Sequence, residues 1–201
     1  MINCADWLDN NTTYIDDNSC VWKYDYPSYY NTKTGWRSAQ AQGEAIQLLI
    51  RSYEITNNKQ CLKTAEEALN AFNIPVSDGG LVDKKDTKSG WWYDKFADEK
   101  CNNPKVLNGM IFTLLALDDA HHRIGSERIK TLFDKEVDAT IERLPEYDTG
   151  DWSSYDRVGN RSSKHYHDIH IKQLKLLYDI TGEPIFKKFQ EQFQSYNRED
   201  D

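Results

Sequence analysis

The chain has 201 residues, 38% of them hydrophobic and 12% aromatic, which suits one folded domain with a sizeable core and excludes intrinsic disorder. Its formal net charge of −8 argues against general nucleic-acid binding and against adhesion to an anionic membrane. The apolar runs are far shorter than the roughly 20 residues that cross a bilayer, and the N-terminus lacks the features of a secretory signal. We therefore expect a single domain over residues 1–201 without membrane insertion, in a compartment that the sequence leaves open.

Helical periodicity dominates the chain after residues 1–35, which we expect to form an N-terminal wall or a further helix. Apolar residues recur at three- and four-residue spacing in six segments, and short turns with Asn57-Asn58, Gly125 or Gly182 join these segments in pairs. A small β-hairpin or ordered loop is expected near residues 76–93, where glycines bracket a polar stretch that ends in three aromatic residues. The predicted helical hairpins cover residues 36–75, 106–144 and 166–196.

One unit therefore occurs three times: a long polar and aromatic loop, a helix, a short turn and a second helix. Consecutive hairpins of this kind stack into an α/α toroid or part of one, with the first helix of each pair inside and the preceding loops gathered at one mouth. We predict an all-α fold, an incomplete α/α toroid. A plain helical-repeat scaffold has short loops, whereas these loops are rich in Tyr and Trp, which favours a binding cleft.

Two stretches are basic against the acidic average of the chain. Residues 84–105 hold six lysines and four acidic residues, and residues 157–164 hold three basic residues and no acidic one. If both stretches lie at the mouth, they form a basic site for an anionic ligand. The alternative is ordinary solvated loop charge.

Polar residues at the helix openings suit a sugar ligand, because a pyranose offers an apolar face for stacking and a rim of hydroxyls. Tyr166, His170 and Gln173 share one helical face, as do His167 and His170. A His-x-x-His pair falls short of the three or four ligands of a zinc site, and the four cysteines are far apart, so we expect no metal. Hydrogen bonding to a polar ligand or to neighbouring loops is the favoured role of the histidines.

Two tyrosines lie in or beside the second basic stretch, Tyr155 and Tyr166. A tyrosine, with an ordinary pKa of about 10, becomes a usable base only where neighbouring cations lower that value. Arg157 and Lys95 are the candidate cations. The alternative is that these tyrosines are packing residues.

Five blocks of the sequence form a pattern when they are taken together and in order. They are Gly35-Trp36-Arg37-Ser38-Ala39-Gln40-Ala41-Gln42-Gly43-Glu44-Ala45-Ile46, Val106-Leu107-Asn108-Gly109, Leu144-Pro145-Glu146-Tyr147-Asp148-Thr149-Gly150, Tyr155-Asp156, and Tyr166-His167 with His170 and Gln173-Leu174. Together they resemble the C-terminal domain of the D-glucuronyl C5-epimerases, and the resemblance covers roughly residues 20–196.

This resemblance implies a helical barrel-like domain, normally preceded by β-rich regions, that inverts C5 of glucuronate within a heparan-type polysaccharide and needs no redox cofactor. Such chemistry requires a base on one face of C5, an acid on the other, and stabilisation of an enolate-like carboxylate. By the same resemblance, Tyr166 matches the catalytic tyrosine of the family and Tyr155 a second active-site tyrosine. Arg157 stands close to a substrate-binding arginine that the family places one residue later.

The chain departs from the family at the catalytic carboxylate. The family has Trp-Tyr-Glu-Glu-Tyr where this chain reads Trp91-Trp92-Tyr93-Asp94-Lys95-Phe96. In one register the catalytic glutamate falls on Lys95, and the acid/base group is lost or replaced by a lysine. In the other register it falls on Asp94, a shorter carboxylate with the same role.

We therefore predict a carbohydrate isomerase that converts D-glucuronate to L-iduronate residues in an anionic polysaccharide, without a cofactor. The alternatives are a non-catalytic domain that binds acidic glycans and a uronate lyase or hydrolase. The expected partner is a uronate-containing polysaccharide or oligosaccharide, and a second copy of the chain or a missing β-rich region is a further candidate. The predicted catalytic residues are Tyr166, Asp94 and Tyr155, and the predicted substrate-binding residues are Arg157, Lys95, Trp36, Gln42, Trp92, Asn108, His167 and His170.

Overall fold

The computed structural model describes residues 2–84, 89–102 and 104–197. No helix in this part of the chain is both long and apolar enough to cross a membrane. The elements, in chain order, are α1 (Ile2–Asn10), β1 (Thr13–Asp16), β2 (Ser19–Val21), α2 (Ala39–Thr56), α3 (Lys59–Asn70), β3 (Val82–Asp83), β4 (Trp92–Tyr93), α4 (Leu107–Ile124), α5 (Glu127–Arg143), α6 (Lys164–Thr181) and α7 (Pro184–Tyr196), with 3-10 turns at Ala71–Asn73, Val76–Asp78 and Leu144–Tyr147.

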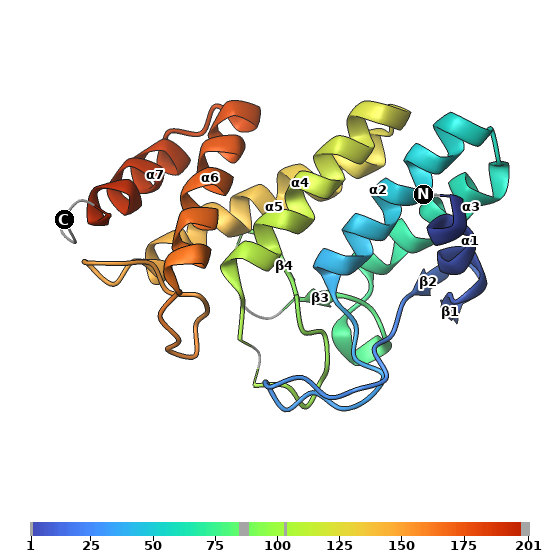
Figure 1. Ribbon diagram of the computed structural model, residues 1–201, viewed down its shortest axis with the longest axis horizontal. Coiled ribbons are helices and arrows are strands. Elements are labelled where there is room, and N and C mark those ends of the chain that lie inside the picture. The colour runs from blue at the N-terminus through green and yellow to red at the C-terminus, as the bar shows by residue number, and fades with distance from the viewer. Residues whose placement is uncertain (1, 85–88, 103, 198–201) are drawn as a thin grey trace.

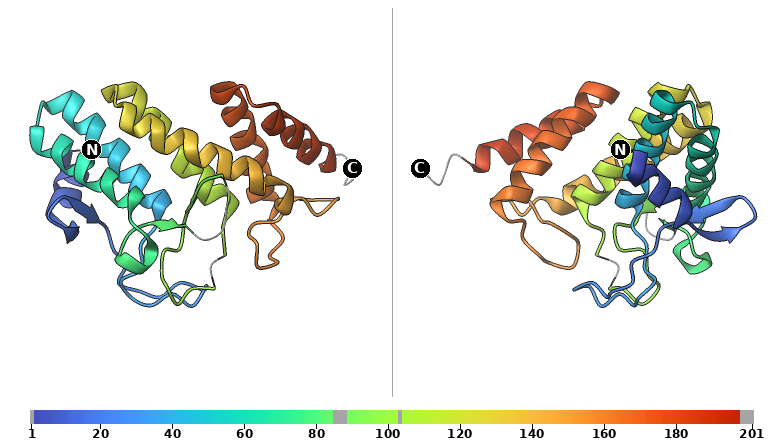
Figure 2. Two further views of the ribbon diagram at one scale, coloured as in Figure 1. Left: turned by 180° about the vertical axis from the view of Figure 1, so that it is seen from behind. Right: turned by 45° about the vertical axis from the view of Figure 1, so that its right-hand side comes forward.

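The six long helices form the three predicted hairpins, α2 with α3, α4 with α5, and α6 with α7. α4 packs between α2 and α6, so the first helices of the three hairpins make one layer. Seen from behind, α3, α5 and α7 make the second layer (Figure 2). The arrangement confirms an all-α fold of the incomplete α/α toroid kind.

Local signals set the ends of the helices. Ser38 caps α2 by accepting a hydrogen bond from the backbone N–H of Ala41, and Ser163 caps α6 in the same way from Tyr166. The residues that follow α4 and α6, Gly125 and Gly182, have φ of 64° and 72°, the left-handed conformation that ends many helices. The short turns inside the hairpins were predictable for this reason.

The segment before α2 is more varied than a single helix or wall. It contains α1 and the antiparallel pair of β1 and β2, and α1 packs against α2 and α3. The small hairpin predicted near residues 76–93 is present: β3 pairs antiparallel with β4, with Val82 opposite Tyr93 and Asp83 opposite Trp92. Lys85 and Lys88, which belong to the first basic stretch, lie outside the described residues.

α2 and α4 approach each other closely at Gly43. A Cβ atom at this position would lie 2.8 Å from the Cβ of Ala116 on α4, closer than two carbon atoms pack in a protein. A glycine at this point therefore allows the two inner helices to touch. Around it lies one main core that extends through all three hairpins.

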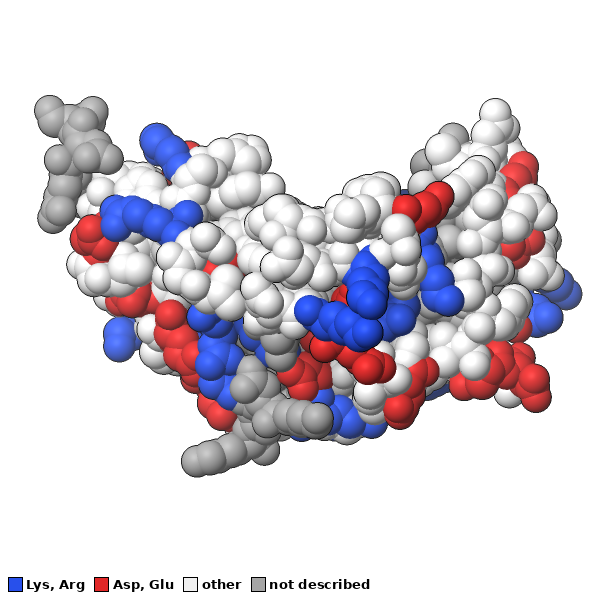
Figure 3. All heavy atoms as spheres, turned by 90° about the horizontal axis from the view of Figure 1, so that it is seen from below, with Lys and Arg blue, Asp and Glu red and all other residues white. Residues whose placement is uncertain are grey.

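α2, α4 and α6 all begin at the same end of the molecule, where the loops that precede them meet (Figure 1, bottom). Backbone hydrogen bonds join these loops: the N–H of Ala97 donates to Arg37 O (2.8 Å), and the N–H of Arg157 donates to Pro104 O (2.8 Å). We call this end the mouth. Viewed from below, it carries basic and acidic side chains together, and the outline is hollowed on one side between the two ends of the molecule (Figure 3).

A buried carboxyl group fixes the short hairpin to the outer layer. Glu136 of α5 is fully buried, and its Oε2 accepts a hydrogen bond of 2.5 Å from the backbone N–H of Trp91, while its Oε1 has no partner among the described residues. Burial raises the pKa of Glu136 from 4.5 to about 8. The folded chain therefore holds this proton over a range of pH in which the unfolded chain releases it.

We expect the Glu136→Gln variant to remove a pH dependence of stability. The protonated carboxyl contributes to the free energy of unfolding. This contribution is fully present below about pH 4.5 and is lost as pH rises through about 8. The variant should match the wild type near pH 4.5 and melt several degrees higher at pH 9, since about 1 kcal/mol shifts the Tm of a domain of this size by roughly 2–4 °C. Thermal melts at both pH values test this, with Glu66→Gln at an exposed position of α3 as the control; equal Tm differences at the two pH values would contradict it.

Candidate active site

A second group of packed side chains, separate from the main core, lies at the mouth. We call it the aromatic cluster. It brings together residues from all three loops and from the first turn of α6: Tyr30, Trp36, Phe96, Val106 and Tyr155 are buried in it, and Tyr24, Cys101 and Tyr166 pack against them. Most of its rings belong to the loop residues that the sequence singled out, so the expectation that these aromatic residues converge is confirmed for this group.

Lys95 extends into this cluster toward the two tyrosines that flank the second basic stretch. Its Nζ donates a hydrogen bond of 3.2 Å to the Oη of Tyr155. The same Nζ lies 5.6 Å from the ring centre of Tyr155 and 5.9 Å from that of Tyr166, distances at which a cation is attracted to an aromatic ring. The centres of the two rings are 4.7 Å apart. The structure therefore brings Lys95, Tyr155 and Tyr166 together.

A glycine allows Lys95 to lie against α4. A Cβ atom at Gly109, in the first turn of this helix, would lie 2.7 Å from the Cβ of Lys95. Any larger residue at this position would push the lysine away from the tyrosines. This close contact gives a physical reason for a glycine in the first turn of α4.

The surroundings of Lys95 change its acid–base behaviour. Burial lowers the pKa of Lys95 to about 8, and the nearby carboxylate of Glu44 on α2 partly opposes this effect. Burial, together with the neighbouring hydroxyl of Tyr29, raises the pKa of Tyr155. Near neutral pH, Lys95 can therefore both hold and release a proton, while Tyr155 keeps its proton and can donate a hydrogen bond.

Asp94 does not share this environment. The residue is 6% exposed, and its Oδ1 lies 3.3 Å from the Nζ of Lys105, whose Nζ also lies 2.6 Å from Asp83 Oδ2. Asp94 directly follows β4 and Lys95 begins the next turn, and their side chains contact different partners. Of the two registers considered for the sequence, the one that puts Lys95 at the position of the family glutamate agrees with this placement.

The two basic stretches meet, and the cations of the second stretch are paired. Arg157 Nε lies 2.5 Å from Glu146 Oε2, Arg161 Nη1 lies 2.9 Å from Asp151 Oδ2, and Lys164 Nζ lies 3.2 Å from Asp168 Oδ1. Lys95 of the first stretch, by contrast, forms no ion pair within 4.0 Å among the described residues. The aromatic cluster therefore contains a partly buried cation without a carboxylate paired to it in the described part of the chain.

His167 and His170 are fully buried and hold the loop that carries Tyr155. Ser153 Oγ lies 2.8 Å from His167 Nδ1 and 2.9 Å from His170 Nδ1. His167 Nε2 lies 2.9 Å from the carbonyl oxygen of Phe193, so Nε2 must carry the proton and Nδ1 accepts from Ser153. Burial lowers the pKa of His170 to about 3, which keeps it neutral.

The remaining predicted residues are mostly turned inward. Gln42 is buried, and its Nε2 donates to the carbonyl oxygens of Cys20 (2.8 Å) and Ala68 (3.0 Å), which fastens α2 to β2 and α3. Trp92 is buried and stacks on Tyr147 with ring centres 6.0 Å apart. Asn108 is buried at the start of α4, where its backbone carbonyl oxygen accepts a hydrogen bond from Gln173 Nε2 (3.1 Å).

Trp36 does lie at the site. Its ring stacks on Tyr24 with centres 4.1 Å apart and an interplanar angle of 12°. A pocket of about 160 Å³ opens beside this pair and reaches Lys95. Its other walls come from Ser38, Gln40, Ala41, Glu44 and Phe96.

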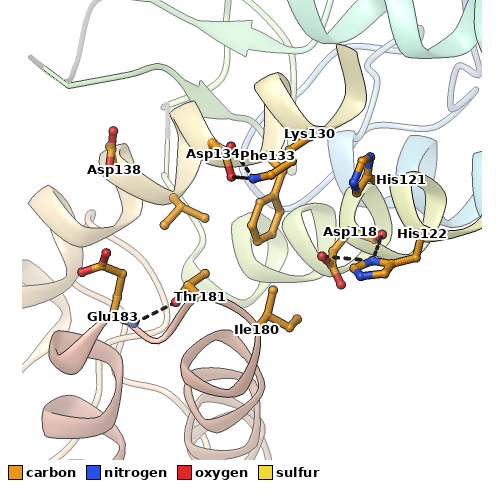
Figure 4. A pocket seen from close by; sticks show the side chains of 11 residues that line it. Asp118, His121, His122, Lys130, Phe133, Asp134, Asp138, Ile180, Thr181 and Glu183 are labelled. Carbon is orange, nitrogen blue, oxygen red and sulfur yellow. Dashed lines mark hydrogen bonds and ion pairs between the residues drawn. The ribbon is translucent and has the colours of Figure 1, made fainter. Parts of the chain in front are cut away.

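A larger pocket, of about 480 Å³, lies at the opposite end of the helices, between α5 and the turn that joins α6 to α7 (Figure 4). None of the predicted site residues lines this pocket.

Two residues at the candidate site are not among the predicted catalytic and substrate-binding residues. Tyr30 is buried, and its hydroxyl donates a hydrogen bond to the carboxylate of Asp156, which is itself buried next to Tyr155 in the chain. Glu44 reaches the pocket from α2. Both lie in segments that the sequence had marked, Tyr30 in an aromatic loop and Glu44 in the block that opens α2, but only the folded chain shows which partners they meet.

Together these features define an α/α-toroid domain whose mouth combines stacked aromatic rings with a partly buried lysine. The model of the family described as D-glucuronyl C5-epimerase C-terminus matches residues 16–195. Because the match spans nearly the whole chain, the chain belongs to this carbohydrate-epimerase family.

Two curated proteins are similar in sequence to this chain. An uncharacterized protein of Methanocaldococcus jannaschii is 36% identical over 187 residues, which cover 90% of this chain and 60% of that protein. A D-glucuronyl C5-epimerase of Caenorhabditis elegans is 28% identical over 181 residues, which cover 81% of this chain and 29% of that protein. The chain thus spans less than two thirds of the length of either relative.

Solved structures of similar fold include a cellobiose 2-epimerase from Spirochaeta thermophila, with a TM-score of 0.59 and 14% identity, and a sugar epimerase from a ruminal bacterium, with a TM-score of 0.54 and 12% identity. Each comparison covers 94% of this chain, but only 48% and 50% of the respective neighbour. The similarity shows the fold, and the chain corresponds to about half of each of those structures.

We expect the amine of Lys95 to titrate near pH 8, because burial among aromatic rings disfavours its charged form. NMR of the chain with ¹³C-dimethylated lysines measures this, with the signal assigned by its loss in Lys95→Arg. In Gly109→Ala the displaced lysine should titrate at higher pH. A wild-type Lys95 that titrates above pH 10 would contradict the described environment.

We expect Ser153→Ala to destabilise the chain by about 1–3 kcal/mol, since it leaves the buried Nδ1 of His170 without its partner and leaves the Nδ1 of His167 with only the longer bond, 3.3 Å, from the backbone N–H of residue 153. Denaturant unfolding compares this variant with Ser195→Ala, an exposed serine at the end of α7. Equal free energies of unfolding for the two variants would show that the buried network does not hold the loop.

Proposed function

We propose that this domain catalyses C5 epimerisation of uronate residues in an anionic polysaccharide, converting D-glucuronate to L-iduronate by removing and returning the C5 proton. The observation that carries the proposal is the contact of Lys95 with Tyr155 beside Tyr166. Membership of the epimerase family supports the reaction class. The choice of glucuronate rests on the C. elegans relative, of whose length this chain covers 29%.

The arrangement meets several requirements of this chemistry. Removing the proton at C5 places negative charge on the adjacent carboxylate, and hydrogen-bond donors aimed at that charge lower the barrier. The hydroxyls of Tyr155 and Tyr166 are such donors, and the Lys95 ammonium adds a positive charge in a partly buried site. Lys95 also exchanges a proton near neutral pH, as a general acid or base should.

The mouth also suits an extended anionic sugar chain. The Tyr24–Trp36 stack offers an aromatic surface for a pyranose ring beside the pocket that Lys95 lines. The pocket is smaller than the roughly 300–1,000 Å³ of sites that enclose a drug-sized ligand, so it would hold one sugar unit while the polymer runs along the open mouth. Arg157, close to the same loops, is the further residue that we assign to the polysaccharide.

One observation favours a second function, non-catalytic binding of acidic glycans. Asp94 is engaged with Lys105, so the aromatic cluster contains a cation and hydroxyls without the carboxylate that the sequence suggested. A binding domain needs stacking surfaces and a cation but no opposed acid and base. The experiment below separates the two functions.

The test is incubation of the purified chain with unsulfated heparosan in deuterated water, followed by NMR and mass analysis of C5. We expect deuterium at C5 together with iduronate, and a loss of roughly 10²–10³-fold in Tyr166→Phe, the cost of removing one donor to a developing negative charge. Tyr178→Phe, on the same helix and away from the mouth, is the control. Binding of heparosan without deuterium incorporation would instead establish the binding domain, and an unsaturated product would establish a lyase.

A further inference from the structure

Two tyrosines at the mouth are exposed although they adjoin buried rings of the aromatic cluster. Tyr26 is 59% exposed and Tyr29 is 70% exposed. Trp36 and Phe96, which they contact, are buried. Neither tyrosine is among the predicted site residues. Exposed aromatic surface that continues a candidate site, rather than standing alone, indicates a place where a ligand lies.

The two exposed rings lie at the two ends of a series of ring contacts. The ring of Tyr26 meets that of Trp36 edge-on, with centres 6.3 Å apart. The centre of the Trp36 ring lies 5.3 Å from that of Phe96, and the Phe96 ring meets Tyr29 edge-on at 5.7 Å. Trp36 and Phe96, in the middle of the series, also line the small pocket that contains Lys95. Each end of the series therefore carries an exposed ring next to a wall of this pocket.

Hydrogen bonds hold the loop that carries both exposed rings. The backbone N–H of Tyr24 donates to Trp36 O (2.9 Å), and the indole N–H of Trp36 donates to the backbone oxygen of Tyr26 (2.7 Å). Within the loop, the buried Oγ1 of Thr32 accepts a hydrogen bond of 2.7 Å from the backbone N–H of Ser28. A ring on a loop that is already ordered loses less conformational freedom when a ligand binds to it.

Tyr29 also connects the exposed surface with the tyrosines of the candidate site. Its ring centre lies 4.2 Å from that of Tyr30. Burial raises the pKa of Tyr30 and of Tyr155, and the neighbouring hydroxyl of Tyr29 adds to the effect in both. Tyr155 in turn accepts a hydrogen bond from Lys95. A ligand that covers Tyr29 therefore lies next to the residues to which we assign the uronate.

We propose that Tyr26 and Tyr29 form two flanking subsites, each of which binds the apolar face of the uncharged sugar unit on one side of the bound uronate. The inference rests on the proposed function, because it takes the uronate polymer as the ligand. A pyranose stacks on an aromatic ring through its apolar face. Lys95 lines the pocket in the middle of the ring series, so the unit with the carboxylate belongs there and its neighbours at the two ends. In heparosan, which alternates glucuronate with N-acetylglucosamine, both neighbours are hexosamines.

Binding of short heparosan oligosaccharides, measured by NMR titration, tests the two subsites. The ligands are methyl glucuronide, the two disaccharides that carry N-acetylglucosamine on one side or the other, and the trisaccharide that carries it on both. We expect Tyr26→Ala and Tyr29→Ala each to weaken trisaccharide binding roughly 10-fold, the scale of loss when an important aromatic contact is truncated. Each variant should also weaken binding of one disaccharide, a different one for each, and leave binding of methyl glucuronide unchanged.

Two further variants separate stacking from other effects. Tyr14→Ala removes a tyrosine that is 51% exposed on β1 and lies outside the aromatic cluster, so it should bind all four ligands as the wild type does. Tyr29→Phe keeps the ring and should keep the affinity for the trisaccharide, whereas a 10-fold loss would assign Tyr29 to hydrogen bonding and overturn the stacking. Unchanged trisaccharide binding in both alanine variants, or an equal loss for methyl glucuronide, would overturn the flanking subsites.

Deuterium exchange at C5 of heparosan by the wild type tests the proposed function separately. Absence of exchange, together with the expected losses of affinity, would contradict the epimerase and leave the flanking subsites established. Exchange by the wild type, together with unchanged affinities in both alanine variants, would leave the epimerase standing without them.

Discussion

The site depends on placing one lysine where water is partly excluded. Lys95 gains a hydrogen bond from its ammonium to Tyr155 and the attraction of two aromatic rings, but it loses much of its hydration, and its pKa falls to about 8. This placement requires the loop after β4 to lie flat on the first turn of α4, which Gly109 permits. The same loop is joined to the start of α2 by the backbone hydrogen bonds between Arg37 and Ala97.

The fold supplies these constraints because its three hairpins begin their inner helices at one end. Each inner helix contributes a different residue to the mouth. α2 contributes Glu44, α4 contributes Gly109, against which Lys95 packs, and α6 contributes Tyr166. The buried Ser153, His167 and His170 network connects the loop of Tyr155 to α6, so the two tyrosines are held by one structural unit. These buried residues therefore hold the two tyrosines in position at the mouth.

The sequence predicted the helical hairpins closely because their signals are local. Apolar spacing and turn residues placed α7 at 184–196, as observed, and the other helices within a few residues. Tyr155, Tyr166 and Trp36, which the sequence predicts as site residues, pack in one cluster at the mouth. The sequence did not reveal which of Asp94 and Lys95 joins the tyrosines, because that choice depends on how the chain turns after β4. The partnership of Tyr30 with Asp156 was equally hidden, since 126 positions separate the two in the chain.

The central claim is that a uronate ring binds beside Lys95, against the Tyr24–Trp36 stack. A crystal structure of the chain with a heparosan oligosaccharide measures this most directly. The account predicts one glucuronate C5 atom within about 3–3.5 Å of Lys95 Nζ, the separation of reacting atoms in a near-attack geometry. An oligosaccharide bound away from the aromatic cluster, for example in the pocket between α5 and the turn joining α6 to α7, would contradict it.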